Sequence, residues 1–342
     1  MGAPLQLTRD QVLAFRRQVQ ALDQRLPPGG GSLQLAAWAG LQDSVPRSAL
    51  HSLHARVSGV NAETWEDPAL VQVWGPRYTA YVVPADAHAA FTLARMPDKG
   101  RMPARAEGIA ERAARHLRGR RLPADALAQS LGIGNDIRYA GLTGTILIRW
   151  AGARQPTVWN VSRPAITADE ALQELIRRYL HVYGPSTIWA FARWAGIDEL
   201  RAIAKFEAMA PKLLGVRTPL GEAWLLAQDE AAIRRRVKPA DSVRLLPSGD
   251  PYYLLWAADR EFLVADAARR GALWTTRVWP GALLLDGEIA GTWRRAGAVV
   301  AVSPWRRLAA ADRQRVEAEA ATLPLPDVTD SARVQWDDSA IS

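Results

Sequence analysis

Three hydrogen-bonding side chains, Gln42, Asp43 and Ser44, stand in a row inside the stretch WAGLQDSVPRSALHSLHARV (residues 38–57). The apolar residues around them recur at roughly helical spacing, which indicates a packed segment. Buried polar groups cost free energy unless they find partners. The triplet therefore either caps a helix or serves a site.

Two interpretations of the triplet remain open at this point. Asp43 or Ser44 can N-cap a helix over 46–57, with Pro46 near its first turn. Alternatively, Gln42 with Asp43 or Ser44 can position a hydrolytic water, which an amide can hold and a carboxylate can also deprotonate. Adjacent residues on a helix diverge by about 100°, so Asp43 would face away from Gln42 unless the backbone kinks. Pro46 makes such a kink possible because it disfavours helical geometry at the residue before it.

Other residues with chemical potential have simpler explanations. His51 and His54 are three residues apart and could share a metal, but without Cys or a third ligand we expect a packed or solvated pair and no metal. His181 ends a predicted helix, where a cation is favourable. Most tryptophans are spaced like core residues, including Trp150, Trp159, Trp189 and Trp194. Trp74, beside the Gly75–Pro76 turn, is a candidate for an exposed tip.

Composition limits the class of protein. The chain has 342 residues, no Cys and a formal net charge of +8, carried almost entirely by Arg. It shows no apolar run long enough to cross a membrane and no secretory signal, so we expect a cytoplasmic protein without disulfides or thiolate chemistry. The charge fits either a high-GC genome, which favours Arg codons, or a polyanionic partner. The segment 101–122 is especially rich in Arg, whereas 326–338 is acidic and is expected to be loosely ordered.

A pattern of helices followed by a β-hairpin recurs three times. The first set has helices over 8–26, 33–40 and 46–57 and strands over 70–75 and 77–84. The second has helices over 103–118, 123–132 and 135–142 and strands over 144–150 and 157–162. The third has helices over 168–184, 187–196 and 198–210 and strands over 213–217 and 222–227. This order is typical of winged helices, and repetition strengthens the prediction.

The predicted secondary structure changes from mainly helical to mainly β after about residue 240. Short β-like runs over 242–247, 252–256, 282–287, 288–293 and 298–304 precede a helix over 308–322. The predicted fold is therefore α+β, with three tandem winged helices and a small C-terminal β-barrel-like domain. The predicted boundaries are 1–100, 101–165, 166–239 and 240–325, followed by an acidic tail over 326–342.

Several stretches, taken in order, resemble the AlkZ/YcaQ family of winged-helix DNA glycosylases. They are GLQDSVPRSALHSLHARV (40–57), RYLHVYGPSTIWAFARWAGI (178–197), LLPSGDPYYLL (245–255) and LLDGEIAGTWRR (284–295). The resemblance covers about residues 8–322 and implies tandem winged helices around a duplex, a C-terminal β-barrel and removal of alkylated bases, including interstrand crosslinks. It also implies an active-site motif, Gln-x-Gln or Gln-x-Asp. Gln42 falls on its first position and Ser44 on its second, while Asp43 stands where the family usually has an apolar residue.

The resulting hypothesis is a DNA glycosylase that acts by positioning water, with no cofactor. An N-alkylated purine is cationic and leaves readily, so the enzyme need only orient a water and stabilise the developing sugar cation. No Lys lies near the triplet, which favours a monofunctional enzyme. We expect a monomer that binds double-stranded DNA and is associated with the nucleoid. The candidate DNA-binding residues are Arg47, Arg112, Arg115, Arg118, Arg120, Arg121, Arg294 and Arg295, although the group over 112–121 also fits a solvated helix face.

Two other hypotheses compete with this one. A non-catalytic winged-helix regulator or damage binder would explain Ser44, because a hydroxyl is a poor base. A metabolic enzyme ranks last, because no phosphate-loop or dinucleotide motif is present.

Overall fold

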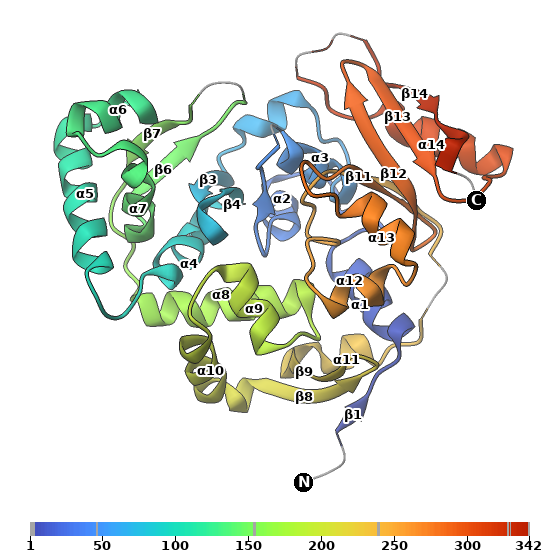
Figure 1. Ribbon diagram of the computed structural model, residues 1–342, viewed down its shortest axis with the longest axis horizontal. Coiled ribbons are helices and arrows are strands. Elements are labelled where there is room, and N and C mark those ends of the chain that lie inside the picture. The colour runs from blue at the N-terminus through green and yellow to red at the C-terminus, as the bar shows by residue number, and fades with distance from the viewer. Residues whose placement is uncertain are drawn as a thin grey trace.

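The computed structural model describes residues 4–45, 47–152, 155–237, 240–326, 328 and 330–340. It is a mixed α+β fold built on three sheets (Figure 1). The strand orders are β1-β8-β9, β2-β4-β3-β6-β7-β5 and β10-β11-β12-β13-β14. Among the described residues, no helix is long and apolar enough to cross a membrane.

The first segment begins as predicted. Thr8 caps helix α1 (Arg9–Val19) and forms a capping box with Gln11. Helices α2 (Gly30–Ala36) and α3 (Ser48–Arg56) follow, and strand β2 (Leu41–Gln42) lies between them. The predicted hairpin is β3 (Leu70–Trp74) with β4 (Ala80–Pro84). The predicted start of the third helix at Pro46 lies outside the described residues.

The second and third segments also follow the predicted order. The second contains α5 (Met102–Leu117), β5 (Leu122–Pro123), α6 (Ala124–Leu131), α7 (Ile137–Ala140), β6 (Ile146–Arg149) and β7 (Thr157–Asn160). The third contains α8 (Ala168–Tyr183), α9 (Ile188–Ala195), α10 (Glu199–Ala208), β8 (Leu213–Thr218), β9 (Gly221–Leu226) and α11 (Glu230–Ile233). The short helix α4 (His88–Thr92) joins the first two segments. Their hairpins are not separate, because β3 pairs with β6 through Gln72 and Ile148 and so unites them in the six-stranded sheet.

The C-terminal segment differs from the prediction in its strands and in two additional helices. Its strands are β10 (Val243–Leu246), β11 (Gly281–Leu285), β12 (Glu288–Ala296), β13 (Val299–Pro304) and β14 (Arg333–Trp336). Their order is linear, so within the described part of the chain no strand pairing closes a barrel. The predicted strand over 252–256 is wrong: the Asp250 carboxylate accepts the N–H of Tyr252 at 2.9 Å and turns the chain instead. The expected loosely ordered tail contains β14, which pairs with β13 in parallel.

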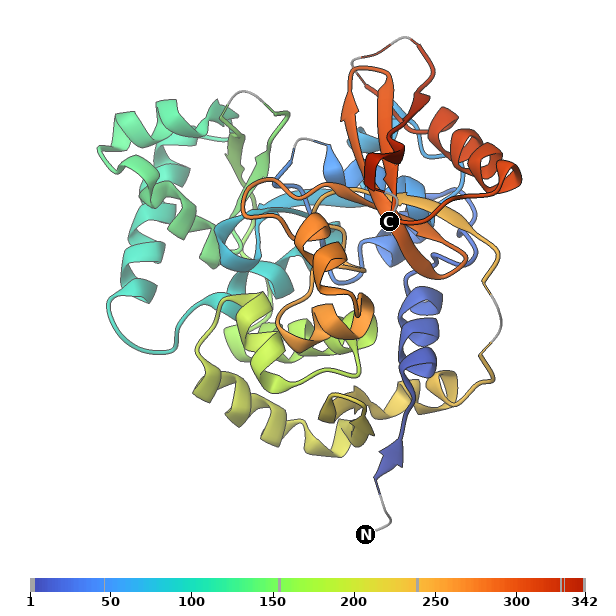
Figure 2. The same cartoon turned by 45° about the vertical axis from the view of Figure 1, so that its right-hand side comes forward.

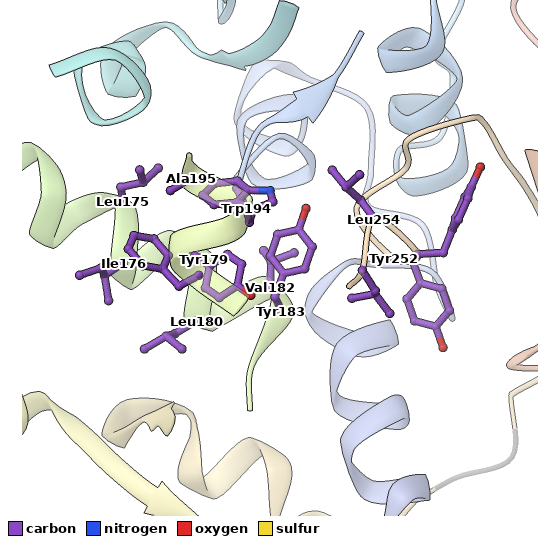
Figure 3. Close-up of a cluster of buried hydrophobic side chains, with 14 of the residues drawn as sticks. Leu175, Ile176, Tyr179, Leu180, Val182, Tyr183, Trp194, Ala195, Tyr252 and Leu254 are labelled. Atoms are coloured by element: carbon purple, nitrogen blue, oxygen red, sulfur yellow. The ribbon is translucent and has the colours of Figure 1, made fainter. Parts of the chain in front are cut away.

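The C-terminal half also contains three helices (Figure 2), which are α12 (Ala258–Leu263), α13 (Ala267–Leu273) and α14 (Ala310–Ala321). The first two of these three helices lie between β10 and β11 and were not predicted. A large buried cluster joins α8 and α9 to α1 and to the Tyr252–Leu255 stretch. Figure 3 shows its aromatic centre, where the rings of Tyr179, Tyr183 and Trp194 pack together. Tyr81 of β4 also contacts Trp194, so this core fixes the third segment against the strand that pairs with β2.

Candidate active site

The polar triplet lies on a strand and its following turn, so its side chains alternate between two faces. Gln42 in β2 is the partner of Tyr81 in β4, and cross-strand partners share a face of the sheet. The next backbone N–H, that of Asp43, donates to the Ala80 carbonyl at 2.8 Å. Asp43 therefore points away from Gln42, as expected for adjacent residues, although on a strand and not on a helix.

Gln42 and Ser44 are joined directly. The Nε2 amide of Gln42 donates to the Ser44 hydroxyl oxygen at 2.7 Å. The other amide atom of Gln42, Oε1, is buried and has no hydrogen-bond partner among the described residues. The backbone of Gly249 packs against this side chain, because an added Cβ there would lie 3.5 Å from Gln42 Cδ. The pair can thus offer a water one carbonyl oxygen and one hydroxyl group.

Asp43 has a different environment. Its side chain is fully buried, and one carboxylate oxygen accepts the Ala49 N–H at 3.0 Å. The other oxygen accepts from the Gln72 amide at 2.8 Å. Asp43 therefore bonds a free N–H in the first turn of α3, but Arg47 occupies the N-cap position, so the prediction that Asp43 or Ser44 is the N-cap residue is wrong. A water-positioning role for Asp43 stays a prediction, and its burial on the opposite face does not favour it.

Burial raises the pKa of Asp43 to about 7, even though Ala49, Arg47, Ser48 and Gln72 each act to lower it. The folded protein consequently holds this proton at pH values where an unfolded aspartic acid has lost it. Stability must then decrease as pH rises through that window and become independent of this group above pH 7.

We expect Asp43→Asn to flatten this part of the pH profile. Between about pH 4 and 7, the wild-type free energy of unfolding should decline by up to about 1.4 kcal/mol per pH unit relative to the variant. Urea titrations of both proteins at half-unit steps from pH 4.5 to 8 measure the difference. If the free energies of unfolding of the two proteins changed in parallel with pH, the raised pKa would not belong to Asp43. The control is Asp10→Asn, on the exposed side of α1.

Arg47 lies at the start of α3. Its guanidinium sits 4.5 Å from the centre of the Trp65 ring, and Arg149 from the second segment lies 5.4 Å from the same ring. Burial is the main cause that lowers the pKa of Arg149, and the neighbouring charges of Arg47 and Arg121 add to it. Arg47 and Arg149 thus both lie near enough to Asp43 to interact with its charge.

An open concavity of about 1140 Å³ adjoins Ser44. The hairpin residues Tyr78, Thr79 and Ala80 form one wall, and Arg138, Arg149 and Trp150 of the second segment line the other side. None of these lining residues was singled out as a functional residue from the sequence. The signal that could have identified Arg149 and Trp150 is their position at the end of a predicted strand, opposite the first hairpin.

The predicted DNA-binding arginines occupy separate surfaces. Arg112, Arg115, Arg118 and Arg120 line a second hollow on α5 and the turn after it. Arg121 stacks on Trp159 at 4.3 Å, on the side of Arg149. Arg294 and Arg295 are exposed at the far end of β12. Of the predicted DNA-binding arginines, Arg47 acts on Asp43 directly, and Arg121 acts on Arg149.

Two of the three histidines considered in the sequence are buried. His51 and His54 are buried, and burial lowers the pKa of His51 to about 4 and that of His54 to about 3. They contact the Pro324 carbonyl and the Thr322 hydroxyl, as a packed pair would. The described residues contain no group of three or more His, Cys, Asp or Glu that could hold a metal. His181 contacts Asp229 at 2.9 Å.

Two tryptophan predictions are wrong. Trp74 is only 5% exposed, because it packs in the core of the second segment, so it is not an exposed tip. Trp194 is fully buried as expected, but Trp189 on the same helix is 41% exposed. The two residues are five positions apart on α9, which places them on different faces.

The fold and this site define a class of protein. A family model described as "DNA glycosylase AlkZ-like" matches residues 35–324. The chain therefore belongs to the AlkZ-like DNA glycosylase family, as the motifs indicated.

Two relatives agree with this membership. The interstrand DNA cross-link repair glycosylase of Streptomyces sahachiroi is 24% identical over an alignment of 357 residues. The alignment covers 91% of this chain and 94% of that protein. The solved structure of Streptomyces sahachiroi DNA glycosylase AlkZ superposes with a TM-score of 0.78 at 21% identity. That match covers 97% of this chain and all of the other, so the two share a fold.

Proposed function

We propose that the protein is a monofunctional DNA glycosylase that hydrolyses the N-glycosidic bond of alkylated bases in duplex DNA. One observation carries this proposal: in a chain of this family, Ser44, which is bonded to Gln42, lines an open concavity with Arg138 and Arg149 in its wall. Crosslinked bases are the substrate class that follows by similarity, because the name of the 24% identical relative mentions cross-link repair; bulky alkylated bases are part of the same proposal.

The chemistry needs few groups. As the C1′–N bond breaks, its electron pair neutralises the cationic base, and positive charge develops on the sugar. A water held by Gln42 Oε1 and the Ser44 hydroxyl then bonds to C1′ and releases a proton to solvent. The carbonyl oxygen of Gln42 has acceptor capacity left for a water, and because this oxygen is buried, the Gln42 side chain must move to expose it to the concavity.

The scaffold would contribute binding. In this proposal the three helix–hairpin segments serve as winged helices, the five-stranded C-terminal segment completes the DNA surface as a barrel-like domain, and a monomer binds one duplex. The exposed arginines of α5, Arg121, and Arg294 with Arg295 would contact phosphates, and such contacts carry much of the affinity for DNA.

A defined test is a duplex with one N7-alkylguanine, incubated with the protein and then heated in alkali to cleave abasic sites. Release faster than spontaneous depurination supports the proposal. Release at the spontaneous rate rejects it.

A non-catalytic DNA-binding protein is the second candidate. The observation that favours it is Ser44, whose hydroxyl replaces the amide or carboxylate of the family motif and already accepts a bond from Gln42. This candidate predicts salt-sensitive binding without abasic product.

Two arginines on α5 provide a test of binding that is separate from catalysis. Arg112 donates to the Leu131 carbonyl and Arg120 to the Leu117 carbonyl, whereas Arg115 and Arg118 have no hydrogen-bond or carboxylate partner among the described residues. We expect Arg115→Ala/Arg118→Ala to reduce the slope of log K against log salt concentration by about 2, one for each lost phosphate contact.

Fluorescence anisotropy on an undamaged 20-base-pair duplex from 50 to 200 mM salt measures this slope. Arg234→Ala is the matched control, because that exposed arginine is paired with Glu230. An unchanged slope for the double variant would place this arginine surface outside the DNA interface.

A further inference from the structure

An exposed tryptophan stands out on helix α9. Trp189 is 41% exposed, although its helix is otherwise the apolar partner of α8 in the core. Arg193 follows four residues later on the same face and lies 5.8 Å from the Trp189 ring centre. Tryptophan is enriched at binding interfaces, because its ring is largely apolar and its N–H can donate a hydrogen bond.

Trp189 is the end of a strip of alternating rings and guanidinium groups. Arg193 also lies 5.8 Å from the ring of Trp256, and Arg77 lies 4.7 Å from that ring. Arg260 continues the strip, at 5.6 Å from Trp256 and 5.1 Å from Trp279. We call Trp189, Arg193, Trp256, Arg77, Arg260 and Trp279 the Arg–Trp strip.

The strip carries charge that the described residues do not neutralise. Arg77, Arg193 and Arg260 form no ion pair with any carboxylate in the described ranges. Arg260 donates instead to the Leu255 carbonyl, at 2.8 Å. Arginine planes and tryptophan faces with uncompensated positive charge are the combination that binds unpaired nucleic acid, because bases stack on the rings while phosphates meet the cations.

The strip is connected to the candidate active site by one turn. Residues Pro76–Tyr78 join β3 to β4, and Arg77 has a left-handed conformation, with φ 55°. Arg77 packs on Gly196 at the end of α9, where an added Cβ would lie 3.1 Å from it. Its neighbours Tyr78 and Thr79 line the concavity that includes Ser44. A DNA strand in the concavity could therefore continue over this turn onto the strip.

We propose that the Arg–Trp strip binds an unpaired nucleotide of the DNA, with its base stacked on Trp189 and its phosphates beside Arg193 and Arg77. This inference rests on the proposed function in taking DNA as the ligand. It adds a place for a base that has left the duplex stack, next to the site where the glycosidic bond would be cleaved. A fully paired duplex offers no such base face away from its ends.

The test uses the full chain and two lesion-free probes, one fully paired duplex and one with a three-nucleotide bulge that contains 2-aminopurine. We expect Trp189→Ala to weaken binding of the bulged probe about tenfold while affinity for the paired duplex changes less than twofold. The 2-aminopurine quenching seen with wild type should also be lost. Trp189→Phe keeps a ring and should stay within threefold of wild type.

Trp336→Ala is the matched control, since this ring also packs under an arginine, Arg313, at 4.5 Å but lies in the C-terminal sheet. Equal affinity of wild type and Trp189→Ala for the bulged probe would overturn the proposal, as would equal losses on both probes. Because neither probe carries a lesion, the outcome is independent of base release, and a failure here is distinct from failure of the glycosylase proposal.

Discussion

Replacing Gln42 by Ala should reduce base release from an N7-alkylguanine duplex on the order of a hundredfold or more, toward the spontaneous rate. The substitution removes the carbonyl oxygen proposed to hold the water, and it also frees the Ser44 hydroxyl that Gln42 fixes at 2.7 Å. Single-turnover kinetics with excess enzyme, read as abasic product, isolates the chemical step. The affinity for duplex should change little, because Gln42 carries no charge.

Two further variants make this prediction specific. Gln18→Ala removes an exposed glutamine of α1 and should leave the rate unchanged. Ser44→Gln restores the Gln-x-Gln pattern of the family, and because Ser44 is exposed beside the concavity a longer side chain has room. We expect it to keep or raise the rate. If Gln42→Ala released the base at the wild-type rate, the assignment of Gln42 as the water-holding residue would be contradicted.

The pattern of elements could be predicted well where local signals were strong. The capping boxes at Thr8 and Thr167, and Gly132 and Gly196 after helices, mark helix ends through local hydrogen bonds or backbone conformation. Long-range pairing could not be predicted in this way. The union of two hairpins through Gln72 and Ile148, and the parallel addition of β14 to β13, depend on contacts between segments far apart in the sequence.

The triplet shows the same limit at the scale of one site. The helices predicted over 33–40 and 46–57 left residues 41–45 between them without an assigned structure. Leu41 and Gln42 form a strand there because β4 offers an edge for pairing. That pairing decides which side chains share a face. Periodicity of two then separates Asp43 from Gln42 and joins Gln42 to Ser44. The resemblance identified the position of the motif, and only the tertiary structure assigned its atoms.

Helix α3 is tied to the C-terminal half by a fully buried ion pair. Arg56 and Asp250 are each 1% exposed, and two parallel hydrogen bonds of 2.7 and 2.8 Å join the guanidinium to the carboxylate. Ser52 also donates to this carboxylate at 2.7 Å. The same turn carries Gly249, which packs on Gln42. The pair therefore holds the family stretch 245–255 against the strand of the candidate site.

Arg56→Ala should lower the free energy of unfolding by about 3–5 kcal/mol, because it leaves the Asp250 carboxylate buried without its partner charge. Arg56→Lys should recover only part of this loss, since an ammonium group cannot form both parallel bonds. Urea titration monitored by tryptophan fluorescence measures the change, and Arg234→Ala, which breaks an exposed pair, should cost no more than about 1 kcal/mol. If Arg56→Ala does not fold, the double variant Arg56→Met/Asp250→Leu decides, because removing both charges should cost much less than removing one. Two results would show that the ion pair does not anchor this turn. One is an Arg56→Ala protein whose free energy of unfolding is within about 1 kcal/mol of wild type, and the other is a double variant no more stable than Arg56→Ala.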